Sequence, residues 1–306
     1  MTQLFDMSFR ADPVGGELDL DKASLAAQQL DGKAHLVLVI HGFNNSLKKA
    51  QDNYADLFKR LGDATTAGQD WAFGAAVVRV YWPGDADWGI FSALVYPTSI
   101  GVANDTGVEL AAILRRLSGL VTGELLVDFI CHSRGNRVAL KALSMLDEVP
   151  GLRVRRCLHM AAAVPTWQLE KTGHEMKLGL ARERLGFGAT SVHSANDNVL
   201  SAVFPVGESL KAGKEGFNPT ALGHEHWPVG DGLPLFAQAA RDELGHGDYW
   251  HRLDLASIHG ALEMGPVLPR RINSSLIPGA DMPIAEPLQA RQTVARDVGE
   301  SLALNG

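Results

Sequence analysis

The feature of this sequence that most constrains its fold is an alternation of short apolar runs with longer amphipathic segments. The runs are rich in Val, Ile, Leu and aromatic residues and have the length of buried strands. They span residues 35–40 (HLVLVI), 75–82 (AAVVRVYW), 125–130 (LLVDFI), 154–160 (VRRCLHM) and 190–194 (TSVHS). Strands that alternate with helices are typical of a mostly parallel sheet covered by helices on both faces. The sequence therefore predicts an α/β fold.

The segments between these runs carry apolar residues at helical spacing. One stripe consists of Leu47, Ala50, Tyr54, Leu57 and Leu61. Ser46 is placed to cap a helix before it, and Gly62 is placed to terminate the helix after it. Two further stripes consist of Leu110, Ile113, Leu114 and Leu117, and of Ala139, Ala142, Leu143 and Leu146. We expect helices at all three places.

Charge and cysteine content limit the partners and the compartment. The formal net charge is −7, the isoelectric point is near 5.9 and no run of Lys or Arg occurs, so we expect neither nucleic acid nor an anionic membrane as a partner. No apolar stretch is long enough to cross a bilayer. Cys131 and Cys157 lie inside apolar runs, which favours reduced core thiols. With no signal pattern at the N-terminus, we expect a cytoplasmic protein, while export without such a signal stays open.

The stretch FICHSRGNRVAL, residues 129–140, places Ser133 between a predicted strand and a predicted helix. With Gly135 two positions later, the chain must turn sharply at the serine. Such a turn projects the hydroxyl above the sheet edge, while the next backbone N–H and the helix N-terminus face a developing oxyanion. The string also occurs by chance in many proteins, so its context decides whether Ser133 is a nucleophile.

That context is a second motif, HLVLVIHGFNNS, in which a buried strand ends in His-Gly. Together the two motifs resemble the α/β-hydrolase superfamily, and with the turn YWPGD (81–85) they are similar to an uncharacterised bacterial branch of it. The resemblance covers about residues 35–260 and implies an oxyanion hole made by the backbone N–H groups of Phe43 and Arg134. Cys131 stands where the usual elbow begins with glycine, although close packing there favours a small side chain.

A serine nucleophile requires a histidine base and a carboxylate that orients the base. The superfamily order of serine, acid and histidine implies Asp197, in the loop after the last predicted strand, as the acid. A helix cap or an Asx-turn is the alternative role of Asp197. Asp128 lies within the strand before Ser133, where a structural hydrogen-bonding role is expected.

We favour His246 as the base, because its flanking glycines in LGHGDYW leave the imidazole free to approach the serine. His224 and His226 are the runners-up. Their spacing is weak evidence for a metal site, because the sequence has no matching cluster of Cys or carboxylate residues elsewhere. The remaining downstream histidines are His251 and His259. His132 and His41 are interpreted as packing and loop-anchoring groups.

The substrate is less constrained by the sequence. Trp88, Phe91, Leu94 and Tyr96 either line an acyl pocket or form a small core under a long loop. Residues 83–107 and 204–244 are candidates for lid insertions. Arg134 would favour an anionic substrate if it faced the pocket. We expect it to pair with an acid on the surface instead, because Arg137 one turn later indicates a basic edge.

Beyond residue 263 the pattern breaks into GPVLPRRINSSLIPGADMPIAEP, whose prolines forbid one continuous element. We therefore expect one hydrolase domain at 1–263 and a C-terminal arm at 264–306. Apolar residues between the prolines need a surface to cover, either the protein's own body or a partner subunit in a homo-oligomer. LQARQTVARDVGESLAL is expected to form a short terminal helix. A mobile tail is the alternative.

These patterns lead to one functional prediction and two alternatives. We predict a serine hydrolase that cleaves a carboxylic ester of a small molecule through an acyl-enzyme, with no cofactor or metal. An acyltransferase would use the same three side chains. The second alternative is a noncatalytic binding protein on a hydrolase scaffold, because fold does not determine function.

Overall fold

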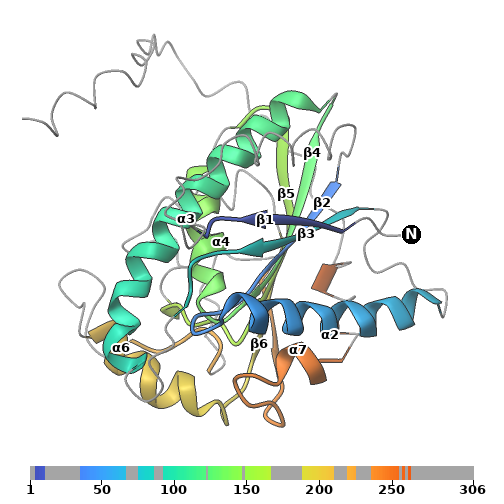
Figure 1. Cartoon of the computed structure of the whole chain (residues 1–306). Coiled ribbons are helices and arrows are strands. Elements are labelled where there is room, and N and C mark those ends of the chain that lie inside the picture. The colour runs from blue at the N-terminus through green and yellow to red at the C-terminus, as the bar shows by residue number, and fades with distance from the viewer. Residues whose placement is uncertain are drawn as a thin grey trace, which may run out of the picture. The chain divides into compact units, whose positions relative to one another are not determined.

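A single parallel sheet of seven strands organises the part of the chain that the computed structural model describes (Figure 1). This part comprises residues 4–10, 35–66, 75–85, 92–121, 123–146, 149–166, 188–209, 219–224, 236–254, 257–258 and 261–262. The strands are β1 (Leu4–Ser8), β2 (His35–Ile40), β3 (Ala76–Tyr81), β4 (Leu125–His132), β5 (Leu152–Met160), β6 (Gly188–His193) and β7 (Phe236–Ala240). Because all paired strands run parallel, their carboxyl ends meet at one edge of the sheet.

The strand order β1-β3-β2-β4-β5-β6-β7 places β2 between β3 and β4. From β2 the chain proceeds to β3 on one side, whereas from β4 it proceeds to β5 on the other side. The connections after β2 and β4 therefore lead away from each other. This topological switch point at the carboxyl edge is where open α/β sheets bind their ligands.

The strands are buried on both faces, which explains why they read as continuous apolar runs. In β2, Leu36, Leu38 and Ile40 belong to the core on one face, and Val37 and Val39 belong to the core on the other. Side chains alternate between the faces along a strand, so a run of five apolar residues fills both cores.

Helices cover both faces of the sheet (Figure 1). The core that contains Leu36 also receives the apolar stripes of α3 (Ser92–Leu120) and α4 (Gly135–Met145). The opposite core receives α2 (Leu47–Thr66) and α7 (Tyr249–Arg252). The short helical segments η3 (Val199–Val203) and α6 (Phe204–Ser209) follow β6. This arrangement is the α/β-hydrolase fold class that the sequence predicts.

The edges of the sheet and one helix end differ from the expectation. β1 and β7 were not predicted, because LFDMS mixes polar with apolar residues and FAQAA has no β-branched residue. They pair with β3 and β6, whose backbone groups complete the ladder. Gly62 does not end α2, which continues to Thr66. One glycine costs only about 1 kcal/mol within a helix, which the packing of α2 outweighs.

The proposed lid segments are described in part. Residues 92–107 of the first segment belong to α3, and the second segment includes α6 and β7. The chain divides into two compact units, Met1–Arg270 and Arg271–Gly306. The arm expected at 264–306 lies outside the described residues. Within the described ranges, no helix combines the length and apolarity needed to cross a membrane.

Candidate active site

Ser133 lies in the turn between β4 and α4 with a φ of 52°, a left-handed conformation that costs energy for a residue other than glycine. Hydrogen bonds on both sides hold this turn. The Ser133 N–H donates to the Met160 carbonyl at 3.0 Å, and the Ser133 carbonyl accepts from the Ala163 N–H at 3.2 Å. The Asn136 side chain also donates to the Ser133 carbonyl, at 2.9 Å. The turn that carries Ser133 is therefore strained but fixed.

Two glycines allow the loop after β2 to approach this turn. A Cβ on Gly135 would lie 2.3 Å from the His41 carbonyl oxygen, closer than any side chain tolerates. A Cβ on Gly42 would lie 2.8 Å from the Cβ of Ser133. Only glycine fits at these positions. The backbone of the His-Gly-Phe loop, which includes Phe43, therefore packs directly against the serine.

Cys131 replaces the glycine that begins the usual elbow without disturbing the turn. Its side chain is fully buried in the core that α3 and α4 cover. The thiols of Cys131 and Cys157 are both buried and not linked by a disulfide. The extra volume of the thiol is thus accommodated on the core side of β4.

His246 hydrogen-bonds both Ser133 and Asp197. The Ser133 hydroxyl lies 2.8 Å from His246 Nε2, and His246 Nδ1 lies 2.8 Å from Asp197 Oδ2. His246 comes from the loop between β7 and α7, and Asp197 comes from the loop after β6. The Asp197 carboxylate is completely buried, whereas 19 % of the His246 side chain is exposed. A buried carboxylate, an imidazole and a serine hydroxyl therefore form one continuous hydrogen-bonded chain.

Asp197 also serves the backbone of its own loop. Its Oδ1 accepts the N–H groups of Val199 at 3.0 Å and Leu200 at 3.1 Å, where η3 begins. The capping role that the sequence left as an alternative is thus performed by one carboxylate oxygen while the other accepts from His246. Asp242 accepts the Ala195 N–H at 2.9 Å. This bond joins the loop that carries Asp197 to the loop that carries His246.

The loop after β2 is locked by Trp82 of the YWPGD turn. Trp82 Nε1–H donates to the His41 carbonyl at 2.7 Å, and the Trp82 N–H donates to His41 Nε2 at 3.3 Å. The two rings stack at 5.7 Å between centroids. His41 Nδ1 then donates to the Gly42 carbonyl at 2.8 Å. Burial lowers the pKa of His41 to about 3, so the ring is neutral and able to accept from Trp82.

The hydroxyl of Tyr54, on α2, joins the carboxyl ends of β2 and β3. It accepts the His41 N–H at 2.8 Å and lies 2.9 Å from the Val39 carbonyl and 2.7 Å from the Val80 carbonyl. The periodic pattern identified Tyr54 only as part of an apolar stripe. A tyrosine in such a stripe is a signal for a buried hydrogen bond, because its hydroxyl needs a partner.

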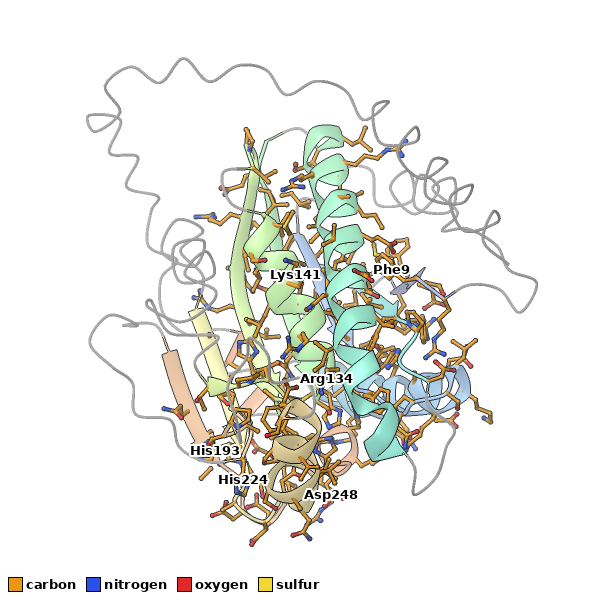
Figure 2. The ribbon with its side chains drawn as sticks, turned by 90° about the vertical axis from the view of Figure 1, so that its left-hand side faces the viewer. Phe9, Arg134, Lys141, His193, His224 and Asp248 are labelled. Atoms are coloured by element: carbon orange, nitrogen blue, oxygen red, sulfur yellow. The ribbon has the colours of Figure 1, made fainter. Side chains whose placement is uncertain are left out.

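Arg134 does not pair with an acid on the surface, and that expectation was wrong. Its guanidinium is fully buried and lies 2.5 Å from Glu208 of α6. Arg137 binds the second oxygen of the same carboxylate at 3.2 Å. The tertiary fold brings α6 over the start of α4, and buried guanidinium groups require a carboxylate partner. Figure 2 shows Arg134 at the end of α4 that lies towards His193 and Asp248, with Lys141 further along the helix.

The other charged candidate, Asp128, lies in β4 and is completely buried. Its carboxylate accepts from Arg155 at 2.6 Å and from His35 at 2.8 Å. These partners belong to β5 and to the first position of β2. Asp128 thus connects strands within the sheet, the kind of structural role expected for it.

The remaining candidates are placed as follows. His224 is half-buried in a turn, where its N–H donates to Ala221, and it is not the histidine bonded to Ser133. His251 pairs with Asp56 at 2.9 Å. α3 includes Leu94 and Tyr96. Outside the described residues lie Trp88, Phe91, His226 and His259. Among the residues described, no group of His, Cys, Asp and Glu is arranged to hold a metal ion.

The parallel sheet, its switch point and the strained serine turn together define an α/β hydrolase. Residues 21–209, more than half of the 306-residue chain, match the model of a family described as alpha/beta hydrolase of unknown function (DUF900). The chain belongs to this family. No curated protein matches it.

Proposed function

We propose that this protein is a serine hydrolase that cleaves a small carboxylic ester through an acyl-enzyme. The observation that carries the proposal is the hydrogen-bonded chain from Asp197 through His246 to Ser133, with both contacts at 2.8 Å. The serine stands at a strained strand-to-helix turn at the switch point of the sheet. Strained backbone at such a position is typical of a nucleophile.

In the first half of the reaction, Ser133 Oγ attacks the ester carbonyl carbon while His246 Nε2 takes the hydroxyl proton. The carbonyl oxygen becomes an oxyanion. When the tetrahedral intermediate collapses, the bond to the alcohol oxygen breaks and His246 gives its proton to that oxygen. The alcohol leaves, and the acyl group remains as an ester of Ser133.

In the second half, His246 takes a proton from a water molecule, whose oxygen attacks the acyl carbon. Collapse of the second intermediate releases the carboxylic acid and returns the proton to Ser133 Oγ. Asp197 holds the imidazole in one tautomer and stabilises the imidazolium ion in both halves. These steps use three side chains of the protein and a water molecule, and they need no cofactor.

The backbone N–H groups of Phe43 and Arg134 are proposed to stabilise the oxyanion. The absence of a side chain at Gly42 supports this role, because it allows the loop to contact Ser133. Arg134 directly precedes the first turn of α4, whose N-terminus carries partial positive charge. Trp88, Phe91 and Tyr96 remain our proposal for the acyl-binding residues.

The proposal is tested by labelling with a fluorophosphonate, which modifies an activated serine irrespective of substrate. We expect Ser133 to be labelled and the Ser133→Ala variant to lose both labelling and the hydrolysis of short p-nitrophenyl esters. Ser144→Ala is the matched control, because Ser144 also lies on α4 and, among the described residues, its hydroxyl donates to the Lys141 carbonyl away from Ser133. Normal turnover by folded Ser133→Ala would refute the mechanism.

A further inference from the structure

His132, the last residue of β4, makes a contact that the reaction described above does not use. Its Nε2 lies 2.7 Å from the backbone carbonyl oxygen of His246. A carbonyl oxygen only accepts, so Nε2 of His132 carries the proton and donates it to this bond. The residue before the proposed nucleophile is therefore bonded to the backbone of the proposed base.

The ring of His132 is held in a closed environment. Only 4 % of the residue is exposed, and the rings of Tyr249 and Trp250 lie 6.0 and 5.3 Å away between centroids. Burial lowers the pKa of His132 to about 3, so the ring is neutral at ordinary pH. Nδ1 has no hydrogen-bond partner among the described residues, so the bond to His246 is the ring's one polar contact there.

The loop that carries His246 is held on both sides of the histidine, by Asp242 and Leu244 before it and by Asp248 after it, whereas His132 holds the carbonyl of His246 itself. Gly245 and Gly247 flank the histidine, and a Cβ on Gly247 would meet no atom within 4 Å. On one side, Asp248 closes a turn by accepting the Gly245 N–H at 2.9 Å. Glycine residues leave the backbone free to rotate, so a hydrogen bond to the carbonyl of His246 itself is an effective restraint.

We propose that His132 is a positioning residue, which sets the place of the His246 imidazole by holding the His246 carbonyl. The inference rests on the proposed function and adds a second anchor to it. Asp197 holds the imidazole at Nδ1, and His132 holds the backbone from which the imidazole extends. Because His132 and Ser133 are neighbours in the chain, the end of β4 determines the positions of both nucleophile and base.

A two-point anchor has a consequence for catalysis. Proton transfer from Ser133 to His246 requires the 2.8 Å contact between Oγ and Nε2 to be maintained. If the Asp197 contact were the only anchor, the imidazole of His246 would shift by rotation about the bonds of its side chain and of the loop backbone. A misplacement of about 1 Å in a reacting group lowers a rate by about a hundredfold. Loss of the His132 bond should therefore affect kcat and leave KM unchanged.

The test compares His132→Leu, which removes the donor, with His132→Gln, whose amide can donate from a similar reach. His35→Leu is the matched control, because its Nε2 also makes a 2.8 Å hydrogen bond, to Asp128. His35 is the first residue of β2 and lies away from the carboxyl edge that carries Ser133. His132→Asn replaces the Leu variant if the latter does not fold, because its amide is polar but too short to reach.

Three experiments are carried out on each folded variant: steady-state kinetics that give kcat and KM for a short p-nitrophenyl ester, the rate of fluorophosphonate labelling, and NMR of the His246 Nδ1 proton. We expect His132→Leu to lower kcat and labelling by about ten- to a hundredfold at constant KM and to broaden the proton signal. His132→Gln should recover most of the loss, within about fivefold of the unaltered protein. His35→Leu should retain both activities.

The outcomes separate this inference from the proposed function. If folded His132→Leu keeps kcat and a sharp proton signal, the positioning role is wrong. Equal losses in the Leu and Gln variants would also contradict it, because the donor would then be irrelevant. If the unaltered protein is neither labelled nor active, the proposed hydrolase function fails. The proton signals of the unaltered protein and its variants would then still decide whether His132 positions His246.

Discussion

At the scale of single residues, the site depends on which histidine reaches the serine. His246 lies in hydrogen-bond contact with Ser133, whereas His224 lies in a separate turn. We predict that His246→Ala lowers kcat by at least about a thousandfold, as expected when the base of such a chain is lost. His224→Ala should change kcat less than about threefold. Steady-state kinetics on both variants tests this, and the reverse result would mean that the base is misassigned.

Gly42 illustrates how one missing methyl group shapes the site. A Cβ there would lie 2.8 Å from Ser133 Cβ and 2.9 Å from His132 Nδ1. We predict that Gly42→Ala displaces the loop, lowers the labelling rate at least about tenfold and lowers the free energy of unfolding by about 1–3 kcal/mol.

The control for this change is Gly119→Ala. A Cβ on Gly119, within α3, would meet no atom within 4 Å. Alanine favours a helix over glycine, so this variant should gain about 0.5–1 kcal/mol of stability and label normally. Urea unfolding and labelling rates measure both effects. Equal labelling by the two variants would show that the approach of the loop to Ser133 is unimportant.

At the scale of elements, α6 is attached to the turn that carries Ser133 by a buried ion cluster. Glu208 binds Arg134 and Arg137, and all three side chains are at most 2 % exposed. Removing the Glu208 carboxylate takes a compensating negative charge away from two buried guanidinium groups. We predict that Glu208→Ala lowers the free energy of unfolding by about 3–5 kcal/mol.

The exposed pair between Lys48 and Asp52 on α2 provides the comparison. Their side chains are 83 % and 60 % exposed, and solvent screens their attraction. Asp52→Ala should therefore cost less than about 1 kcal/mol. Chemical unfolding of the two variants measures the difference. Similar losses would show that the buried cluster contributes no more than a surface pair.

Edge strands show a different effect at the same scale. β1 was not predicted, yet it leads to Arg10, which donates to the Asn45 carbonyl at 2.9 Å and pairs with Asp85. Asn45 lies in the loop after β2, and Asp85 lies in the YWPGD turn. A short edge strand thereby supports the loop that packs against Ser133.

At the scale of the whole molecule, two buried neutral histidines make stability depend on pH. Burial lowers the pKa of both His41 and His132 to about 3, against a usual value of 6.5. Below pH 6.5 the unfolded chain therefore binds more protons than the folded chain at these positions. The free energy of unfolding must fall as the pH falls from about 6.5 towards 3.

At pH 5 each histidine should cost about 2 kcal/mol of stability relative to pH 7.5, or about 4 kcal/mol together. Urea unfolding at the two pH values measures the loss. His132→Gln cannot titrate in this range, so about half of the loss should disappear in that variant. An unaltered protein that is equally stable at both pH values would contradict the assignment of two neutral buried rings.

Features of the fold that depend on local pattern could be predicted from the sequence. Apolar runs bounded by turn residues predicted the five interior strands, and helical spacing located α2, α3 and α4. The turn at Ser133 followed from the strand before it and Gly135 after it. The superfamily order of serine, acid and histidine implied Asp197, and the flanking glycines favoured His246. The structure brings these two residues into hydrogen-bond contact with each other.

The edge strands, the buried ion pair and the hydrogen bond of His132 could not be predicted from the sequence, because each depends on a partner that is distant in the chain. β1 and β7 form because the edges of an existing sheet offer unpaired backbone groups. The composition of the two segments does not by itself indicate a strand. Arg134 is buried because Glu208 arrives from 74 positions away. His132 meets the carbonyl of His246 across 114 positions. A local pattern records propensity and periodicity, whereas these contacts exist only once the sheet has placed its loops at one edge.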